Sequence, residues 1–238
     1  MDVVLKIENL KIGYNNNILF PIINLSAYRK DFICILGKNG IGKTTFLNTI
    51  TGIQNQIEGN IFYKNIDMAK ITNREKSSLI SFVPSRLDYF SNLKVFDLVA
   101  LGRCPYTNIF DKKNLNDKQI ISKVLSDFDL TKISNKAIYQ ISDGERQKTM
   151  IARAVAQQTS IIILDEPTAF LDYSTKKKLF SDLAKITNEN NICTIFSTHD
   201  IELALQYANK FWIFDKNVEE YSLQEIKKNN ILKIIFDY

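Results

Sequence analysis

The sequence predicts an α/β protein: a phosphate-loop core with a mostly parallel sheet, a small antiparallel β lead-in and an inserted helical subdomain. Three observations lead to this prediction. A glycine-rich loop stands between a short apolar run and a helical pattern. Two other apolar runs, Ser160 to Leu164 and Ile192 to Ser197, are continuous, as is typical of strands buried on both faces. Between residues 86 and 140, apolar side chains instead recur at helical spacing.

The N-terminal residues predict the antiparallel lead-in. Val3 to Asn9 and Asn24 to Tyr28 have the composition of strands, and the asparagine-rich stretch Lys11 to Asn17 between them predicts a turn. Within that stretch, Tyr14 has two interpretations that spacing alone leaves open. It either stacks on the adenine ring of a nucleotide, since every base offers a π face, or packs at the turn as an ordinary aromatic side chain.

Gly37 to Thr45 is the stretch around which the other elements are arranged. Gly37 is followed by four residues and then by Gly42, Lys43 and Thr44, which is the spacing of a phosphate-binding loop. Glycines let the backbone curl so that N–H groups point at phosphate oxygens, and the positive end of the following helix adds to the attraction. Lys43 is expected to reach the β and γ phosphates, and the Thr44 hydroxyl to bind Mg²⁺. The residues expected to contact the nucleotide are Gly37, Lys38, Asn39, Gly40, Ile41, Gly42, Lys43, Thr44 and Thr45.

The middle of the chain predicts two more core strands and then a group of helices. Gly59 to Tyr63 and Ser81 to Pro84 have strand patterns, and a polar, weakly helical surface from Asp67 to Ser78 separates them. The helical pattern between 86 and 140 is interrupted by a loop from Gly102 to Lys113. These helices are expected to form a subdomain inserted between strands of the core.

The segment from Ile141 to Gln147 leads into another helix. Ser142, with Glu145 three residues later, has the pattern of a capping box. One interpretation is an ordinary helix start. The other is a second anion site, because the free N–H groups of a helix start favour phosphate. Spacing alone favours the ordinary helix start.

The apolar run that ends at Leu164 leads into Asp165, Glu166 and Pro167. Successive strand residues point to opposite faces, so two adjacent carboxylates can have different roles. Asp165 is expected to hold Mg²⁺, directly or through water, and Glu166 to act as a general base toward an attacking water. Pro167 favours an extended backbone at Glu166. The alternative, a solvated acidic turn, is weak here, because a phosphate loop requires an acidic partner for its metal.

Asp172 is expected to open a helix from Tyr173 to Asn190. The single histidine, His199, follows the run that ends at Ser197. A lone histidine is more often structural than catalytic, but this one stands at the C-terminal end of a predicted strand, where ligands bind in open α/β sheets. The remaining predicted elements are a core strand from Lys210 to Phe214 and a C-terminal helix from Ser222 to Phe236.

Composition limits the classes of protein to consider. The 238 residues, of which 45% are hydrophobic, suffice for one buried core. A net charge of +5 fits a protein that handles ATP or lies near anionic lipid, and it does not by itself argue for nucleic-acid binding. The three cysteines have neither disulfide nor zinc spacing, which predicts a reducing compartment. The N-terminus lacks a signal-peptide layout, and no apolar run approaches the roughly 20 residues that span a bilayer, so any membrane role is expected to come through a partner.

Taken together, these stretches resemble the ATP-binding-cassette (ABC) ATPases, and the resemblance covers essentially the whole chain. Gly37 to Thr45 matches the Walker A loop of a P-loop ATPase core, Ile161 to Glu166 resembles Walker B with its catalytic glutamate, and Ile141 to Gln147 resembles the family signature. The remaining matches are Asp172 in the D-loop, implied to contribute to the nucleotide site, His199 as the switch histidine, and Tyr14 at the adenine-stacking position.

The resemblance implies an ATPase that uses ATP and Mg²⁺, with Lys43, Glu166 and His199 as its catalytic residues. It also implies that Ser142 and Gly144 contact the ATP bound by a second copy of the chain. Two copies would then enclose two ATP molecules head to tail, and the competent form is a dimer. The expected organisation is one cassette domain over residues 1–238, with a core of 1–85 and 156–238 and a helical subdomain of about 86–155.

Two positions depart from the family pattern. The family has Gln after the strand that matches Ile80 to Pro84, where this chain has Ser85, and the signature begins with Ile141 in place of Leu. Ser85 is kept among the residues expected on the Mg²⁺ side of the site. Its shorter side chain weakens the usual link between the nucleotide and a transmembrane partner.

A further stretch resembles one class of the family. The stretch from Leu98 to Tyr106, which contains Gly102-Arg103-Cys104-Pro105, is similar to a "Gly-Arg-x-Pro" stretch of ATPases that serve importers of iron chelates (siderophores), haem and cobalamin. This implies two transmembrane permease subunits as partners, an extracytoplasmic substrate-binding protein acting through them, and a peripheral place on the cytoplasmic side of the plasma (inner) membrane.

Two other classes are the alternatives. An exporter cassette for lipid, peptide or drug is often fused to membrane spans. A non-transport ABC protein acting on ribosomes or DNA typically carries two cassettes or a long coiled-coil insert. Neither feature is present in the sequence, so an importer subunit with no nucleic-acid partner is expected.

Overall fold

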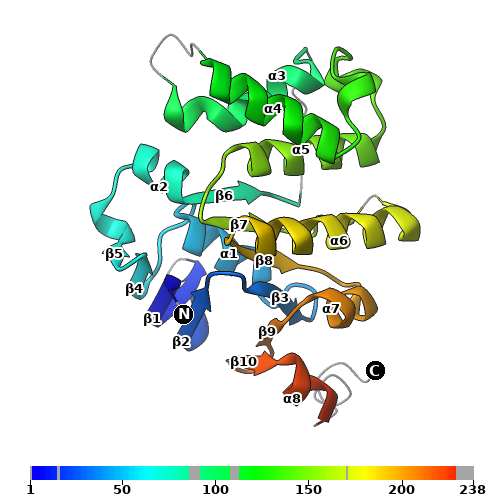
Figure 1. Cartoon of the computed structure of the whole chain (residues 1–238). Coiled ribbons are helices and arrows are strands. Elements are labelled where there is room, and N and C mark those ends of the chain that lie inside the picture. Colours follow the sequence, from blue (N-terminus) through cyan, green and yellow to red (C-terminus); the bar gives the residue numbers. More distant parts are fainter. Residues whose placement is uncertain (1, 15–16, 86–91, 108–112, 170, 229–238) are drawn as a thin grey trace.

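The computed structural model describes residues 2–14, 17–85, 92–107, 113–169 and 171–228 (Figure 1). Its larger sheet has the spatial order β10-β9-β3-β8-β7-β6. Neighbouring strands in it run parallel, except that β10 is antiparallel to β9. This mostly parallel sheet confirms the predicted α/β class. The strands are β3 (Phe32–Gly37), β6 (Ile80–Val83), β7 (Ile161–Leu164), β8 (Cys193–Ser197), β9 (Lys210–Phe214) and β10 (Val218–Ser222).

The predicted antiparallel lead-in forms a second sheet, in the order β2-β1-β4-β5. The turn predicted over Lys11 to Asn17 is wrong, because both strands run into it: Gly13 pairs with Ile18 and Tyr14 with Asn17. Residues 15–16 lie outside the described part. Cross-strand pairing and the burial of apolar side chains outweigh the turn preference of asparagine here. The strands are β1 (Val3–Tyr14), β2 (Asn17–Tyr28), β4 (Glu58–Tyr63) and β5 (Ile66–Asp67).

Helices α3, α4 and α5 gather at the top of Figure 1, on the opposite side of β6 and β7 from the small sheet. This is the inserted helical group that the sequence predicts; its limits at about 86 and 155 stay a prediction. The described helices are α1 (Lys43–Thr51), α2 (Asn73–Leu79), α3 (Val95–Ala100), α4 (Leu115–Asp127), α5 (Asp143–Ala156), α6 (Tyr173–Glu189), α7 (Ile201–Tyr207) and α8 (Leu223–Lys228), and the 3₁₀ turns cover Met68–Lys70, Leu101–Tyr106, Thr131–Ile133 and Ile138–Gln140.

Other predicted boundaries need correction. The loop is expected to begin at Gly102, but this residue lies inside the 3₁₀ turn Leu101–Tyr106. Residues 108–112 of the expected loop lie outside the described residues. Ser222, the expected start of the C-terminal helix, is the last residue of β10; α8 ends at Lys228, and 229–238 are not described. Strand β10 and helix α7 were not predicted. Both are short and half-exposed, so their apolar periodicity in the sequence is weak.

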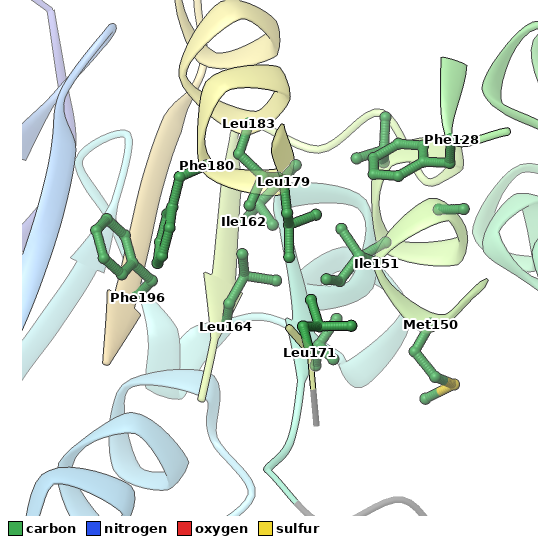
Figure 2. Packing of buried hydrophobic residues seen from close by; sticks show 14 of the residues in the cluster. Phe128, Met150, Ile151, Ile162, Leu164, Leu171, Leu179, Phe180, Leu183 and Phe196 are labelled. Carbon is green, nitrogen blue, oxygen red and sulfur yellow. The ribbon is translucent and has the colours of Figure 1, made fainter. Parts of the chain in front are cut away.

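The described apolar side chains form two clusters, one on each face of the larger sheet. Because strand residues alternate between faces, Cys34 of β3 lies in one cluster and its neighbour Ile33 in the other. Figure 2 shows the first cluster, in which the ring of Phe180 of α6 lies beside that of Phe196 of β8, with Leu164 of β7 below Phe180. This packing holds the C-terminal ends of the parallel strands at one edge of the sheet.

Helix α5 is attached to the edge strand β6 by hydrogen bonds to backbone carbonyls. Arg153 donates to the carbonyl of Phe82 over 2.8 Å. One turn later, Gln157 donates to the carbonyls of Ser77 and Ile80, over 2.5 and 3.2 Å. The helix that carries the signature segment at its start is therefore joined at its other end to the strand that leads to Ser85.

Candidate functional site

The phosphate loop joins β3, whose residues are all buried, to α1. Gly40 and Gly42 have φ angles of 75° and 116°, in the left-handed region that favours glycine. At Gly42 the left-handed backbone disfavours any side chain, and a Cβ atom there would also lie 3.1 Å from Leu19 Cδ1, a tight contact. The predicted strand, loop and helix context is confirmed. The curled backbone is shaped to cradle an anion of the size of a phosphate.

Lys43 directs its ammonium group into this loop. Its Nζ donates to the carbonyls of Gly37 and Lys38, over 2.7 and 3.1 Å. Burial lowers the pKa of Lys43, and the negative charges of Glu166 and Asp165 act in the opposite direction. The cation is therefore partly desolvated beside a loop built for an anion, which strengthens its attraction to a bound phosphate.

Asp165 is held by two hydroxyl groups from other elements. Thr44 Oγ1 donates to its Oδ2 over 2.8 Å, and Ser197 Oγ donates to its Oδ1 over 2.6 Å. The Thr44 and Asp165 oxygens thus meet beside the loop, which suits Mg²⁺, a cation that prefers oxygen ligands. No group of three or more His, Cys, Asp and Glu side chains among the described residues could hold a metal. An ion at Thr44 and Asp165 would therefore need phosphate oxygens or water to complete its shell.

Ser197 is a site residue that the sequence reasoning missed. It is fully buried at the end of β8, donates to Asp165 and accepts a 2.9 Å hydrogen bond from the backbone N–H of Glu166. One hydroxyl group therefore orients both acidic residues. The only signal in the sequence is a polar residue at the end of the apolar run Ile192 to Ser197.

Glu166 has a left-handed backbone, with φ of 49°, so the extended conformation expected before Pro167 is wrong. The contacts of Glu166 explain the difference: Ser197 binds its N–H, and His199 Nε2 lies 2.7 Å from its Oε1. These contacts offset a backbone cost of about 1–3 kcal/mol. Strain of this kind is frequent at functional sites, and here it aims the carboxylate at His199.

His199 also borders the phosphate loop. A hollow of about 180 Å³ is lined by Leu36, Gly37, Lys38, Asn39, Thr198, His199 and Ile201. The structure therefore brings together the three side chains expected to be catalytic, Lys43, Glu166 and His199, from three separate parts of the chain. Lone-histidine positions are often structural, but the side chain of this one is 47% exposed at the strand ends.

Tyr14 lies at the end of β1, beside the phosphate loop. Its ring is 56% exposed, and its hydroxyl shares a 3.0 Å hydrogen bond with Thr45 Oγ1, just inside α1. The exposed ring is accessible to a ligand, and stacking on adenine stays a prediction beside packing at the turn. The ring offers a face to a flat ligand, and the hydrogen bond to the buried Thr45 restricts its orientation.

The other predicted residues lie further along the chain. Ser142 is exposed and caps α5, where it forms the predicted capping box with Glu145; Gly144 follows in the first turn. Asp172 caps α6, and hydrogen bonds from the Ser174 hydroxyl and from the Thr175 hydroxyl and N–H hold its pKa well below the usual range. Roles of these residues toward a nucleotide stay predictions.

Ser85 lies just beyond β6 and is half-buried. The residues that follow it, 86–91, are outside the described part, so its expected place near the metal stays a prediction. In the described parts of the chain, none of the helices combines the length and the apolar character that a membrane crossing needs.

The comparisons with known proteins agree with this site. The family model described as "ABC transporter" matches residues 20–169. An uncharacterized ABC transporter ATP-binding protein of Methanocaldococcus jannaschii is 36% identical over 98% of this chain and 81% of that protein. The molybdate import ATP-binding protein MolC of Haemophilus influenzae is 32% identical over 91% of this chain and 81% of its own length. Relatives from Bacillus include ATP-binding proteins named for iron(3+)-hydroxamate and petrobactin import.

A solved structure described as a metal-chelate type ABC transporter in an inward-facing conformation superposes with a TM-score of 0.85. It is 29% identical, and the match covers 100% of this chain and 90% of that one. Both the phosphate loop and the strand ends that carry Glu166 and His199 lie within the matched length. The chain therefore belongs to the ABC transporter family and is an ATP-binding subunit with ATPase activity.

Proposed function

We propose that this chain is the energy-coupling subunit of an ABC importer for an iron chelate (siderophore), haem or cobalamin. The observation that carries the importer class is the folded form of the stretch from Leu98 to Tyr106. Arg103 is buried and paired with Asp117 of α4 over 2.8 Å. It also donates to the carbonyl of Ala156 and to Gln158, over 2.8 and 3.0 Å.

This arrangement leaves one aromatic side chain of the stretch at the surface. The guanidinium of Arg103 lies 4.3 Å from the centre of the Tyr106 ring, which is nevertheless 44% exposed. Leu101, in the same stretch, is 38% exposed. A rigid turn that presents aromatic and aliphatic side chains suits a protein partner. We infer that it contacts a permease subunit.

ATP hydrolysis is assigned to the residues gathered at the strand ends. The loop N–H groups and Lys43 would bind the β and γ phosphates, and Thr44 and Asp165 would hold Mg²⁺, which supplies neutralisation of phosphate charge. Glu166 would accept the proton of the attacking water, and His199, 2.7 Å away, would orient that carboxylate.

The adenine ring would stack on the exposed face of Tyr14. Ser142 and Gly144 lie at the start of a helix, where N–H groups favour phosphate. We infer that they reach the ATP bound by a second copy, with Asp172 nearby at the same interface. The competent form would then be a homodimer that encloses two ATP molecules.

In this proposal the homodimer binds two transmembrane permease subunits from the cytoplasmic side of the plasma (inner) membrane. ATP would close the dimer and hydrolysis would reopen it, which drives the permease between its two states. A substrate-binding protein outside the membrane would act through the permease. Molybdate is the alternative cargo, since a 32% identical relative carries that name.

The test is reconstitution with the permease encoded or purified with this chain. We expect co-purification of the permease and ATP-dependent uptake of one iron chelate, haem or cobalamin by proteoliposomes, with no uptake of molybdate. Tyr106→Ala should reduce permease capture. Tyr139→Ala is the matched control, because that tyrosine is 64% exposed and lies outside the stretch. Uptake of molybdate alone, or capture of an exporter, would contradict the proposed cargo.

A further inference from the structure

Asp200, the residue after His199, occupies the N-cap position of α7 but does not cap it. Aspartate at an N-cap usually accepts a hydrogen bond from the first turn of its helix, a contact worth about 1 kcal/mol. Here the carboxylate turns to other partners. Its Oδ2 accepts a 3.1 Å hydrogen bond from Thr168 Oγ1, and both of its oxygens lie within 3.3 Å of Lys176 Nζ.

Lys176 is equally out of place for helix stability. It is the fourth residue of α6, close to the positive end of the helix dipole, where a cation is disfavoured. Its side chain is only 21% exposed and leads to Asp200. Asp200 therefore forms an ion pair with Lys176 in place of a helix cap, and Lys176 forms it from a position that the helix dipole disfavours. Lys176 and Asp200 belong to different helices, and the pair joins them beside the catalytic strand ends.

Thr168 connects this pair to Glu166. The threonine is 3% exposed and stands two residues after Glu166, separated from it by Pro167. Proline fixes its own φ angle, which removes one of the few backbone rotations between Glu166 and Thr168. Two hydrogen bonds then close a small ring: His199 to Glu166 over 2.7 Å, and Asp200 to Thr168 over 3.1 Å, with backbone on both sides.

We propose that Asp200, Thr168 and Lys176 are positioning residues that hold His199 against Glu166. The hydrogen bond between His199 and Glu166 joins the two candidate catalytic residues. The hydrogen bond between Thr168 and Asp200 joins the backbone segments that carry them. Lys176 orients the Asp200 carboxylate so that one oxygen stays directed at Thr168. This inference rests on the proposed roles of Glu166 and His199 in hydrolysis.

The alternative is a purely structural network that supports the fold. The two differ in what they affect. A structural network changes unfolding temperature and nucleotide affinity along with turnover. A positioning network changes kcat with little effect on ATP affinity, and its effect depends on His199 being present.

The test measures steady-state ATP hydrolysis, ATP affinity and thermal unfolding of the full chain. Loss of a neutral hydrogen bond corresponds to roughly fivefold in rate, and the bond from Thr168 to the charged Asp200 carboxylate is expected to contribute at least as much. We expect Thr168→Val and Asp200→Ala each to lower kcat about fivefold to tenfold with KM for ATP unchanged. Lys176→Met should have a smaller effect that Lys176→Arg restores. Lys177→Met is the control, since Lys177 is an exposed lysine on the same helix and should leave kcat unchanged.

The deciding measurement repeats Thr168→Val in a His199→Ala background. If Thr168 acts through His199, the second substitution adds less than about twofold. An equal fall of kcat in both backgrounds, or wild-type turnover in Thr168→Val, Asp200→Ala and Lys176→Met, overturns the proposal. Wild-type turnover in Glu166→Gln and His199→Ala would instead show that the proposed catalytic roles fail. Should Asp200→Ala not fold, the threonine and lysine variants give the same answer.

Discussion

The Nε2 atom of His199 lies 2.7 Å from Oε1 of Glu166. The two residues follow neighbouring parallel strands, in which Leu164 of β7 pairs with Phe196 of β8. Their contact is therefore set by the register of two strands that lie more than 30 residues apart in the chain. The fold itself therefore places a side chain that can accept a proton beside one that can orient it.

Glu166→Gln should bind ATP but hydrolyse it poorly. The amide keeps the shape of the side chain and can still contact His199, yet it cannot accept the proton of water. Loss of a general base costs about 10²–10⁴-fold in rate. Gel filtration with ATP should show a dimer that accumulates because it does not turn over. A monomer under these conditions, with turnover equal to that of the wild type, would contradict both the role of Glu166 as general base and the dimer that encloses two ATP molecules.

Lys43→Ala should abolish tight ATP binding. The substitution removes the buried ammonium that the loop carbonyls of Gly37 and Lys38 hold in place. Charge-assisted contacts of this kind are about twice as strong as neutral ones. Titration with a fluorescent ATP analogue measures the affinity. Lys177→Ala serves as the control; if both variants bind ATP like the wild type, Lys43 is not the phosphate-binding cation.

Tyr14→Ala should weaken ADP and ATP binding to the same extent, because adenine is common to both. Stacking of a base on an aromatic ring contributes about 1–3 kcal/mol, so the expected loss is at least several-fold. Tyr14→Phe keeps the ring and loses only the hydrogen bond to Thr45, so its effect should be smaller. Isothermal titration with both nucleotides separates the cases. Unchanged affinities in Tyr14→Ala would remove the stacking assignment.

The buried Arg103–Asp117 pair should make stability depend on pH in acid. Burial acts to raise the pKa of Asp117, but hydrogen bonds from Arg103 and the Asn114 cap segment prevail and hold it below the ordinary value. A lowered folded-state pKa stabilises the fold above the unfolded value of about 3.9, and this contribution is lost as pH falls further. Asp117→Asn should therefore destabilise the protein at neutral pH, by about 3–5 kcal/mol.

Thermal unfolding of wild type and Asp117→Asn as a function of pH checks this expectation. The gap in unfolding temperature should begin to narrow as the pH drops below about 4, where the carboxyl of the unfolded chain takes up a proton, and should close once the folded carboxyl is neutral as well. Asp127→Asn, at an exposed position of the same helix, should change little. A gap that stays constant down to pH 2 would show that the ion pair does not control stability.

Ser85→Gln should raise Mg-ATP turnover several-fold without changing ADP affinity. Serine is shorter by about two bonds, so a contact with the metal or the attacking water would need a bridging water. A neutral hydrogen bond contributes about 1 kcal/mol, or roughly fivefold in rate. ADP lacks the γ-phosphate and should not respond. The measurement is the rate of ATP hydrolysis by the wild type and by Ser85→Gln, each with and without permease. If the two proteins have equal rates under both conditions, Ser85 has no sensing role.

Much of the site follows from local sequence patterns, because each predicted part depends on a few consecutive residues. The phosphate loop needs a strand, glycines and a helix in succession, and Asp165 with Glu166 needs only an apolar run that ends in acids. Ser197 and Asp200 could not be assigned in this way. Their roles depend on the direction that a side chain takes once distant strands are paired. Asp200 stands at the N-cap position of α7, yet its side chain does not cap that helix.

The same distinction explains the errors in the fold. Lys11 to Asn17 has the composition of a turn, but pairing between β1 and β2 carries the strands through it. Glu166 precedes a proline, yet hydrogen bonds from β8 and His199 impose a left-handed backbone. In both places a tertiary contact worth a few kcal/mol outweighs a local preference of similar or smaller size.

The attachment of α5 to β6 has a consequence for which substitutions can weaken it. In the described part of the chain, the hydrogen bonds of Arg153 and Gln157 go to the main chain of Ser77, Ile80 and Phe82, and every amino acid supplies the same carbonyl. Substitutions of Ser77, Ile80 or Phe82 therefore leave these hydrogen-bond acceptors in place, although Ile80 also packs in the core. The hydrogen bonds between this strand and the helix that begins at Ser142 depend instead on the side chains of Arg153 and Gln157.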